Sequence, residues 1–385
     1  MKIIYFSHSC FTDCDFPLVG ELQRRGHDVS YYIPIASFNK RSALLDIKRL
    51  HPKTGIFRAV DIYEEFRPYE NVIDLSKVYV VNKRHKQKYH PANLWLMLRL
   101  VWHFHRQQAD VIQLTKEPSL MMKCLYLMKK KLVLTVHDPF IHSGAGSKGK
   151  ERDRKTAYRN IQKLVLLNGR QVKDFSEYYH IPESRIFLSK LGEYGCIEQV
   201  PSVPAGVGKP YILFFGLIAE YKGIEYLLEA MVRVHRQYPE VMLVVAGGGK
   251  YYFDISPFQG LNYIQFRNRY ISIAELSGLL RDCEFGVCPY KDATQSGVVQ
   301  TAFTLGVPMV VTDVGALADA VRDGKTGIVV KPCDTDALAV GICRLLEDDR
   351  LLESMRNNID SEWKPNMGWR SIAEDYIKCY QSKIE

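Results

Sequence analysis

Three short stretches of the sequence place polar side chains after apolar runs, in patterns that suit phosphate or sugar binding. The first is FFGLIAEYKGI, in which Gly216 ends an apolar run and Lys222 precedes another glycine. If a helix begins at this lysine, its free N–H groups, its dipole and the cation all favour a bound phosphate. The spacing leaves one alternative open, an exposed lysine in the first turn of a helix.

The second stretch, PYKDATQSGVVQT, lies between an apolar strand-like run and an apolar helix-like run. Ser296 can cap the helix, which leaves the N–H groups of Gly297 and Val298 available to a diphosphate. Thr294 and Gln295 are small or polar loop residues that suit contact with a sugar. An ordinary capped loop between a strand and a helix is the alternative.

The third stretch is LTVHDP, in which an apolar run ends at His137 and Asp138. The following proline favours an irregular turn, so the pair is expected at the edge of a cleft. A histidine there can donate to a sugar hydroxyl or act as an acid or base, although a structural role fits equally well. The other histidines suggest no metal set, and the nine cysteines show no pair of CxxC sites, so we expect reduced thiols and no bound metal.

The elements that must position these residues alternate between strands and helices in two series. The first series begins with a strand over residues 2–6, a helix capped by Asp15, and a strand over residues 28–35. The second series begins at the strand 211–215, after the Pro- and Gly-rich linker QVPSVPAGVG. The pattern predicts an α/β protein of two doubly wound, Rossmann-like domains that bind ligands at the carboxyl ends of their strands.

Charge is unevenly distributed along the 385 residues. Residues 1–200 contain 33 Lys and Arg against 20 Asp and Glu, a balance of +13, whereas residues 201–385 contain 19 against 23, a balance of −4. The basic half favours an anionic partner: a membrane surface, a nucleic acid or an acidic substrate. No nucleic-acid recognition motif is found, so we expect no nucleic-acid partner.

A basic run, KRHKQKYH (residues 83–90), precedes the apolar segment LWLMLRLVW (residues 94–102). This segment is too short to span a bilayer but can lie on an anionic membrane, or it can be a buried core helix. No signal peptide is recognised. We therefore expect a cytoplasmic protein that is at most peripheral on the inner face of the cytoplasmic membrane.

Several of these motifs resemble the C-terminal domain of the retaining glycosyltransferases of family four, which have the GT-B fold. The resemblance rests on residues 216–223, the glycines at 247–249, and the run from 290 to 327, above all ATQSGVVQTAFTLGVPMVVTDVGALADAVRDGKTGIVVKP. TVHDPFIHSG, which contains His137, resembles an N-terminal-domain motif of one bacterial subgroup.

The resemblance implies two Rossmann-like domains facing a central cleft. Residues 1–200 would bind the acceptor, residues 205–365 would bind the nucleotide sugar, and a C-terminal helix over residues 366–385 would pack back on the first domain. It implies a hexosyltransferase that moves a sugar from a nucleoside-diphosphate sugar to a glycan or lipid-linked acceptor, with retention of configuration and without a metal or cofactor. Synthesis of a bacterial surface polysaccharide or glycolipid is the expected setting.

The resemblance also implies residue roles. Lys222 and His137 would be catalytic, the lysine by stabilising the leaving diphosphate. The nucleotide base would lie near Tyr270 and Ile271. His8 and Asp138 would lie on the acceptor side. The expected donor-binding residues are Gly216, Lys222, Tyr270, Ile271, Thr294, Gln295, Ser296, Gly297, Val298 and Thr301.

The sequence departs from the family pattern at three positions. Many members have two glutamates eight positions apart around this loop, and the corresponding residues here are Ala293 and Thr301. An arginine that often follows the first glycine is Leu217 here. Two alternatives therefore stay open: a degenerate scaffold that binds a sugar nucleotide or a partner without catalysis, and another GT-B enzyme such as a sugar-nucleotide epimerase.

Overall fold

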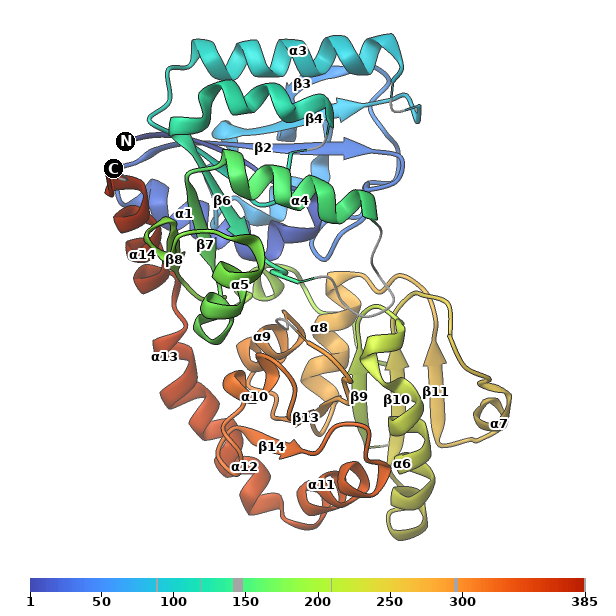
Figure 1. Ribbon diagram of the computed structural model, residues 1–385. Coiled ribbons are helices and arrows are strands. Elements are labelled where there is room, and N and C mark those ends of the chain that lie inside the picture. Colours follow the sequence, from blue (N-terminus) through green and yellow to red (C-terminus); the bar gives the residue numbers. More distant parts are fainter. Residues whose placement is uncertain (88, 119, 141–147, 209, 294–296, 384–385) are drawn as a thin grey trace. The chain divides into compact units, whose positions relative to one another are not determined.

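The computed structural model describes residues 1–383 except 88, 119, 141–147, 209 and 294–296. The described residues of Met1–Phe140, Ser147–Gln199 and Trp369–Glu385 form one compact unit, and those of Val200–Gly368 form a second. Each unit is built on its own sheet, shown in Figure 1.

The first unit contains an eight-stranded sheet in the order β3-β4-β2-β1-β5-β6-β7-β8. Neighbouring strands are parallel except for the edge pair of β3 and β4. The inner strands are almost continuously apolar, as expected for strands covered on both faces. The strands are β1 (Lys2–Phe6), β2 (Asp28–Ala36), β3 (Gly55–Arg58), β4 (Val78–Lys83), β5 (Val111–Leu114), β6 (Leu132–Val136), β7 (Lys163–Leu166) and β8 (Ile186–Leu188).

Helices cover both faces of this sheet (Figure 1). On one face, helices α3, α4 and α5 and a 3₁₀ segment share a core with the strands. On the other, α1 packs against α14. Their bounds are α1 (Thr12–Arg24), α2 (Ala59–Ile62), α3 (Pro91–Arg106), the 3₁₀ segment Leu120–Lys131, α4 (Lys148–Asn160), α5 (Val172–Tyr179) and α14 (Trp369–Gln381).

The start of α1 differs from the prediction, because Asp15 does not cap the helix. The helix begins at Thr12, and Asp15 lies inside it with 1% of its surface exposed. Its carboxylate accepts hydrogen bonds from the hydroxyl groups of Tyr5, Ser7 and Tyr31. A buried carboxylate needs such donors, and two of them come from neighbouring strands that local sequence cannot place beside the helix.

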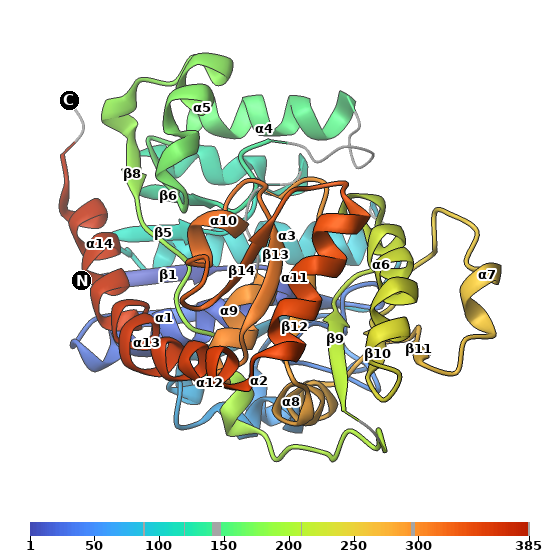
Figure 2. The same cartoon turned by 90° about the horizontal axis from the view of Figure 1, so that it is seen from below.

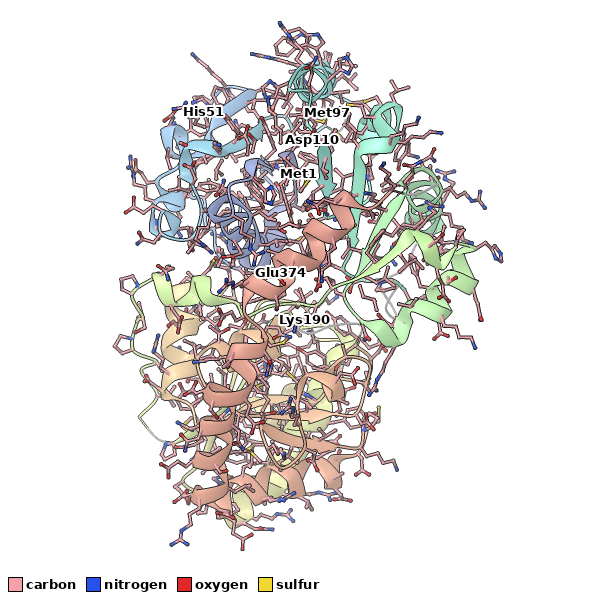
Figure 3. The ribbon with its side chains drawn as sticks, turned by 90° about the vertical axis from the view of Figure 1, so that its left-hand side faces the viewer. Met1, His51, Met97, Asp110, Lys190 and Glu374 are labelled. Atoms are coloured by element: carbon pink, nitrogen blue, oxygen red, sulfur yellow. The ribbon has the colours of Figure 1, made fainter. Side chains whose placement is uncertain are left out.

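The C-terminal helix α14 is held in the first unit by several polar contacts. The hydroxyl of Tyr376 lies 2.9 Å from Thr135 Oγ1, and that of Tyr380 donates to Gln113 Oε1 over 3.0 Å. Glu374, labelled in Figure 3, pairs with Arg25, the residue directly after α1, over 3.1 Å. The end of the chain therefore belongs to the same core as its first strand.

The second unit contains a six-stranded parallel sheet in the order β11-β10-β9-β12-β13-β14. Helices α6 and α11 lie side by side against it, as Figure 2 shows. The strands are β9 (Tyr211–Phe215), β10 (Met242–Ala246), β11 (Ile264–Arg267), β12 (Gly286–Cys288), β13 (Met309–Thr312) and β14 (Gly327–Val330). The helices are α6 (Ile224–Gln237), α7 (Ser256–Gln259), α8 (Ile273–Asp282), α9 (Gly297–Thr304), α10 (Leu317–Ala320), α11 (Thr335–Glu347), α12 (Asp349–Asn358) and α13 (Lys364–Asn366).

These two mainly parallel α/β units confirm the predicted fold class. Among the described helices, none combines the length and the apolar character that crossing a membrane requires.

Candidate functional site

In the second unit, the candidate site lies where β9 and β10 end. Gly216 follows β9 with φ +119°, in the region that favours glycine. A Cβ atom added to Gly247, directly after β10, would lie 1.7 Å from the carbonyl oxygen of Gly216. The two strand ends therefore touch backbone to backbone, a packing that a side chain at position 247 would prevent.

Lys222 is buried next to this edge, with 8% of its surface exposed. It ends a short 3₁₀ turn, and Gly223 then starts α6 in a left-handed conformation. A Cβ on Gly223 would lie 2.0 Å from the carbonyl oxygen of Pro289, so this glycine lets the start of α6 approach the loop after β12. The alternative of an exposed lysine in the first turn of a helix is wrong.

Aromatic groups surround the Lys222 ammonium. Its Nζ donates to the hydroxyl of Tyr290 over 2.5 Å and lies 5.0 Å from the centre of the Tyr221 ring. Such rings stabilise a cation without neutralising it. The neighbouring Lys291 pairs through its Nζ atom with Glu225 Oε1 over 2.9 Å.

Helix α9 begins close to the same edge. A Cβ on Gly216 would lie 3.6 Å from Cγ2 of Val298, the second residue of α9. Thr301 donates its hydroxyl proton to the carbonyl oxygen of Gly297 over 2.7 Å. Its oxygen can therefore still accept a hydrogen bond but has no proton left to donate. The predicted site residues Thr294, Gln295 and Ser296 lie outside the described residues.

The loop after β11 carries Tyr270 and Ile271, both half-buried. A Cβ on Gly248 would lie 3.6 Å from the Tyr270 nitrogen, so this loop touches the turn after β10. Arg269 holds the loop by donating to the Tyr270 carbonyl oxygen over 3.2 Å and pairing with Glu275 over 2.6 Å. The structure thus brings most of the described donor-site candidates to one edge of one sheet.

In the first unit, His137 directly follows β6 and stacks on Phe11, with 3.8 Å between the ring centres. Burial lowers the pKa of His137 to about 4, so the imidazole is neutral near pH 7. Its Nε2 atom is buried and has no hydrogen-bond partner among the described residues. A ligand hydroxyl could supply that partner.

His8 follows β1 and lines a cavity of about 480 Å³ in the first unit. Burial, and then the charges of Lys116 and Lys83, lower the pKa of His8 to about 4. Asp138, the other predicted acceptor-side residue, does not line this cavity. The sequence prediction does not include the two lysines, although Lys83 begins the basic run for which a membrane contact and a solvated loop are the two alternatives.

Helix α3 has one buried and one exposed apolar face. Figure 3 shows the helix end-on, with the buried Met97 on the side of the sheet. Trp95, Leu98 and Trp102 are exposed by 56%, 67% and 56%. The guanidinium carbon of Arg99 lies 5.2 Å from the Trp95 ring centre, and that of Arg106 lies 4.6 Å from the Trp102 ring centre. The segment 94–102 is therefore neither fully buried nor polar on its outer face.

Over the part of the chain that is described, no three His, Cys, Asp or Glu side chains gather as a metal site would require.

Comparison with known proteins gives two matching family models. Residues 17–188 match the model described as Glycosyltransferase Family 4, and residues 209–348 match Glycosyl transferases group 1. The chain is 29% identical over 177 residues to an uncharacterized glycosyltransferase of Methanocaldococcus jannaschii. The matched residues are 45% of this chain and 45% of that one. It is 31% identical over 153 residues to alpha-D-kanosaminyltransferase of Streptomyces kanamyceticus, 39% of this chain and 40% of that one. The chain thus spans less than half the length of these curated relatives.

Solved structures resemble the chain over almost its whole length. Sucrose-phosphate synthase from Thermosynechococcus elongatus matches with a TM-score of 0.68 and 15% identity, covering 99% of this chain and 98% of that one. HepE of Anabaena in complex with UDP and glucose matches with a TM-score of 0.69 and 15% identity, covering 98% of each. At this identity the likeness shows the fold alone, and it confirms the predicted GT-B fold.

Proposed function

Because the chain belongs to the glycosyltransferases of group 1 and family 4, we propose that it moves a sugar from a nucleoside-diphosphate sugar to an acceptor. The transferred sugar is a hexose, its configuration is retained, and the acceptor is a glycan or a lipid-linked molecule. The observation that carries this proposal is the convergence of Gly216, the buried Lys222 and the start of α9 at one strand edge of the second unit.

This edge suits a leaving diphosphate. As the bond to the sugar breaks, negative charge grows on the diphosphate and must be stabilised. We assign this to the Lys222 ammonium and to the N–H groups of Gly297 and Val298 at the start of α9. A buried cation acts strongly because little water screens it. With these groups in place, the reaction needs no metal ion or other cofactor.

The remaining donor contacts follow the same edge. The base would lie against Tyr270 and Ile271, and Thr301 Oγ1 would accept a hydrogen bond from a ribose hydroxyl. Thr294, Gln295 and Ser296 would meet the sugar and its phosphates. Each contact is a proposal for mutagenesis.

His137 is proposed to bind a sugar hydroxyl through its unpartnered Nε2 atom. Since burial keeps the imidazole neutral, the side chain acts by hydrogen bonding and not as a cation. His8 and Asp138 are assigned to the acceptor side of the reaction.

The exposed face of α3 supports a membrane location for the acceptor. Trp95 and Trp102 are amphipathic side chains that favour the headgroup region of a bilayer, and arginines stacked on them can reach lipid phosphates. We propose that this face rests on the anionic inner surface of a cytoplasmic membrane. The reaction would then serve a bacterial surface polysaccharide or glycolipid.

A second candidate function is a scaffold that binds a sugar nucleotide without transferring the sugar. It is favoured by the absence of carboxylates at Ala293 and Thr301, and by the use of the Thr301 proton within its own helix.

A two-stage experiment separates these functions. A thermal-shift screen against UDP, GDP, ADP and dTDP identifies the base, because a ligand that binds the folded state raises its melting temperature. Labelled sugars on that nucleotide are then incubated with the protein and membrane lipids. Transfer supports the enzyme, nucleotide binding without transfer or hydrolysis supports the scaffold, and no binding at all rejects both.

A further inference from the structure

The cavity of the first unit has a chemical character of its own. We infer that it binds an acceptor in which a phosphate or diphosphate group is joined to an apolar group. This inference rests on the proposed function, because it names the acceptor class of that reaction. The cavity lies at the carboxyl ends of β1, β4 and β5, where α/β sheets hold their ligands.

Three lysines give the cavity its charge. Lys83, Lys86 and Lys116 line it, and none of them forms an ion pair with the carboxylate of a described residue. Glu117 also lines the cavity, but its carboxylate lies 3.4 Å from Arg154 and accepts a hydrogen bond from Tyr158 over 3.1 Å. The lining is therefore positive overall, and a ligand anion would supply the missing negative charge.

Two of these lysines act on the same neighbouring side chain. The charges of Lys116 and Lys83 both reach His8, which also lines the cavity, and oppose its protonation. Cations brought together in a partly enclosed space repel one another, so a ligand carrying at least two negative charges would be favoured. A phosphate monoester or a diphosphate has this charge.

Apolar side chains form another part of the wall. Phe6, Leu114, Met122 and Leu125 line the cavity beside the lysines, and the lining residue Phe38 is 75% exposed. A free inorganic anion would make no favourable contact with such apolar side chains. An anion joined to a hydrocarbon chain would use both parts of the lining.

Asn93 adds a buried side-chain oxygen that receives no hydrogen bond from any described residue. It is 4% exposed, and its Nδ2 atom donates to the carbonyl oxygens of His85 and Gln87 over 3.0 and 2.9 Å. These two bonds fix the amide orientation and leave Oδ1 buried without a donor. A hydroxyl group of the acceptor would complete it, as a sugar attached to the phosphate would allow.

The test uses the full chain and three soluble probes in titration calorimetry: decyl phosphate, the uncharged decyl maltoside, and inorganic phosphate. Both decyl compounds are kept below their critical micelle concentrations. We expect decyl phosphate to bind more tightly than either other probe. If decyl maltoside binds as tightly as decyl phosphate, the cavity does not select for the phosphate group. If inorganic phosphate binds as tightly as decyl phosphate, the cavity does not use the apolar chain.

A double variant, Lys86→Gln with Lys116→Gln, links the binding to this cavity. Both lysines are exposed, so folding should be retained. The affinity for decyl phosphate should fall about tenfold, the loss of roughly one charge-assisted hydrogen bond. Lys173→Gln, an exposed lysine on α5 outside the lining, is the matched control and should change nothing. An unchanged affinity in the double variant would overturn the inference.

Nucleotide binding, measured separately by thermal shift, distinguishes the two proposals. If nucleotides fail to bind while decyl phosphate binds selectively, the transferase proposal fails and the cavity remains an anion-and-lipid site. If nucleotides bind while decyl phosphate shows no preference over decyl maltoside, the acceptor inference alone fails.

Discussion

At the scale of single residues, burial decides what the charged groups of this protein can do. Lys222 would be an ordinary surface cation if it stood in an exposed helical turn. Instead it is buried and enclosed by Tyr221 and Tyr290, so little water screens its charge. The departures from the family pattern at Leu217, Ala293 and Thr301 make this lysine the central described cation of the proposed donor site.

Replacing Lys222 by Met should therefore reduce sugar transfer strongly. Loss of one group that stabilises developing charge typically lowers kcat by about 10²- to 10³-fold. Lys222→Arg should recover part of the activity, and Lys325→Met, which removes an exposed lysine of the same unit, should behave as wild type. Initial rates with saturating donor measure the effect, and wild-type rates in Lys222→Met would refute the assignment.

Asp15 allows a prediction about stability and pH. Burial raises the pKa of its carboxyl from 3.8 to about 7, despite hydrogen bonds from Ser7, Tyr5 and Tyr31 that act in the opposite direction. Between about pH 4 and pH 7 the folded state therefore keeps a proton that the unfolded state has lost. The contribution of Asp15 to the free energy of unfolding thus falls as pH rises through this window, by at most about 1.4 kcal/mol per unit.

Urea unfolding of wild type and Asp15→Asn at pH 5, 6 and 7 measures this contribution. The free energy of unfolding of wild type minus that of the variant should decrease from pH 5 to pH 7. The same comparison with Asp174→Asn, an exposed residue of α5, should show no such trend. A difference for Asp15→Asn that stays constant with pH would mean that the carboxyl is ionised throughout.

At the scale of elements, α3 has a buried apolar face and an exposed one that carries two tryptophans. Leu96, Met97, Leu100 and Phe104 are buried in the core of the first unit. The tryptophans on its outer face are paired with arginines and do not contribute to that core. Substitutions on the outer face should therefore change surface binding without changing stability.

The double variant Trp95→Ser with Trp102→Ser tests the membrane proposal. Wild type should sediment with vesicles containing phosphatidylglycerol and much less with vesicles of phosphatidylcholine alone. Loss of two large aromatic groups should weaken the first interaction about tenfold or more. Tyr178→Ser removes a similarly exposed ring from α5 and should have no effect. Equal sedimentation of all three proteins would exclude α3 as the contact.

At the scale of the whole molecule, the chain returns to its first unit at its end. Ile372, Tyr376 and Cys379 of α14 are buried there. Lys163 donates to the carbonyl oxygens of Cys379, Tyr380 and Ser382 over 2.7 to 2.9 Å and so ties down the last turn. Residues 369–383 are thus part of the fold and not a tail.

Deletion of residues 369–385 should therefore destabilise the first unit selectively. Amide hydrogen exchange should show lost protection in β1, β5 and β6, while the strands of the second unit stay protected. Removal of only the last two residues serves as the control and should leave exchange unchanged. Retained protection of β1 and β5 in the longer deletion would show that α14 is dispensable for this core.

The sequence by itself was enough to predict the fold class and to recognise the family that the chain resembles. Strands and helices can be predicted because the periodicity of apolar residues is a local property of the chain. The glycines at 216, 223 and 247 can be predicted to lie in turns because their conformational freedom is also a local property. The same reasoning singled out Gly216 and the His137–Asp138 pair, because each directly follows the end of a strand.

The tertiary structure decided which side chains meet. The strand order β4-β2-β1-β5 does not follow the chain, so Lys83, His8 and Lys116 reach one cavity from segments far apart in the sequence. Tyr290 encloses Lys222 from 68 residues away. The burial and the electrostatic environment of a side chain depend on such distant neighbours. For this reason the sequence showed a basic run and a glycine motif, and only the tertiary structure showed that they contribute to a cationic cavity and surround a buried lysine.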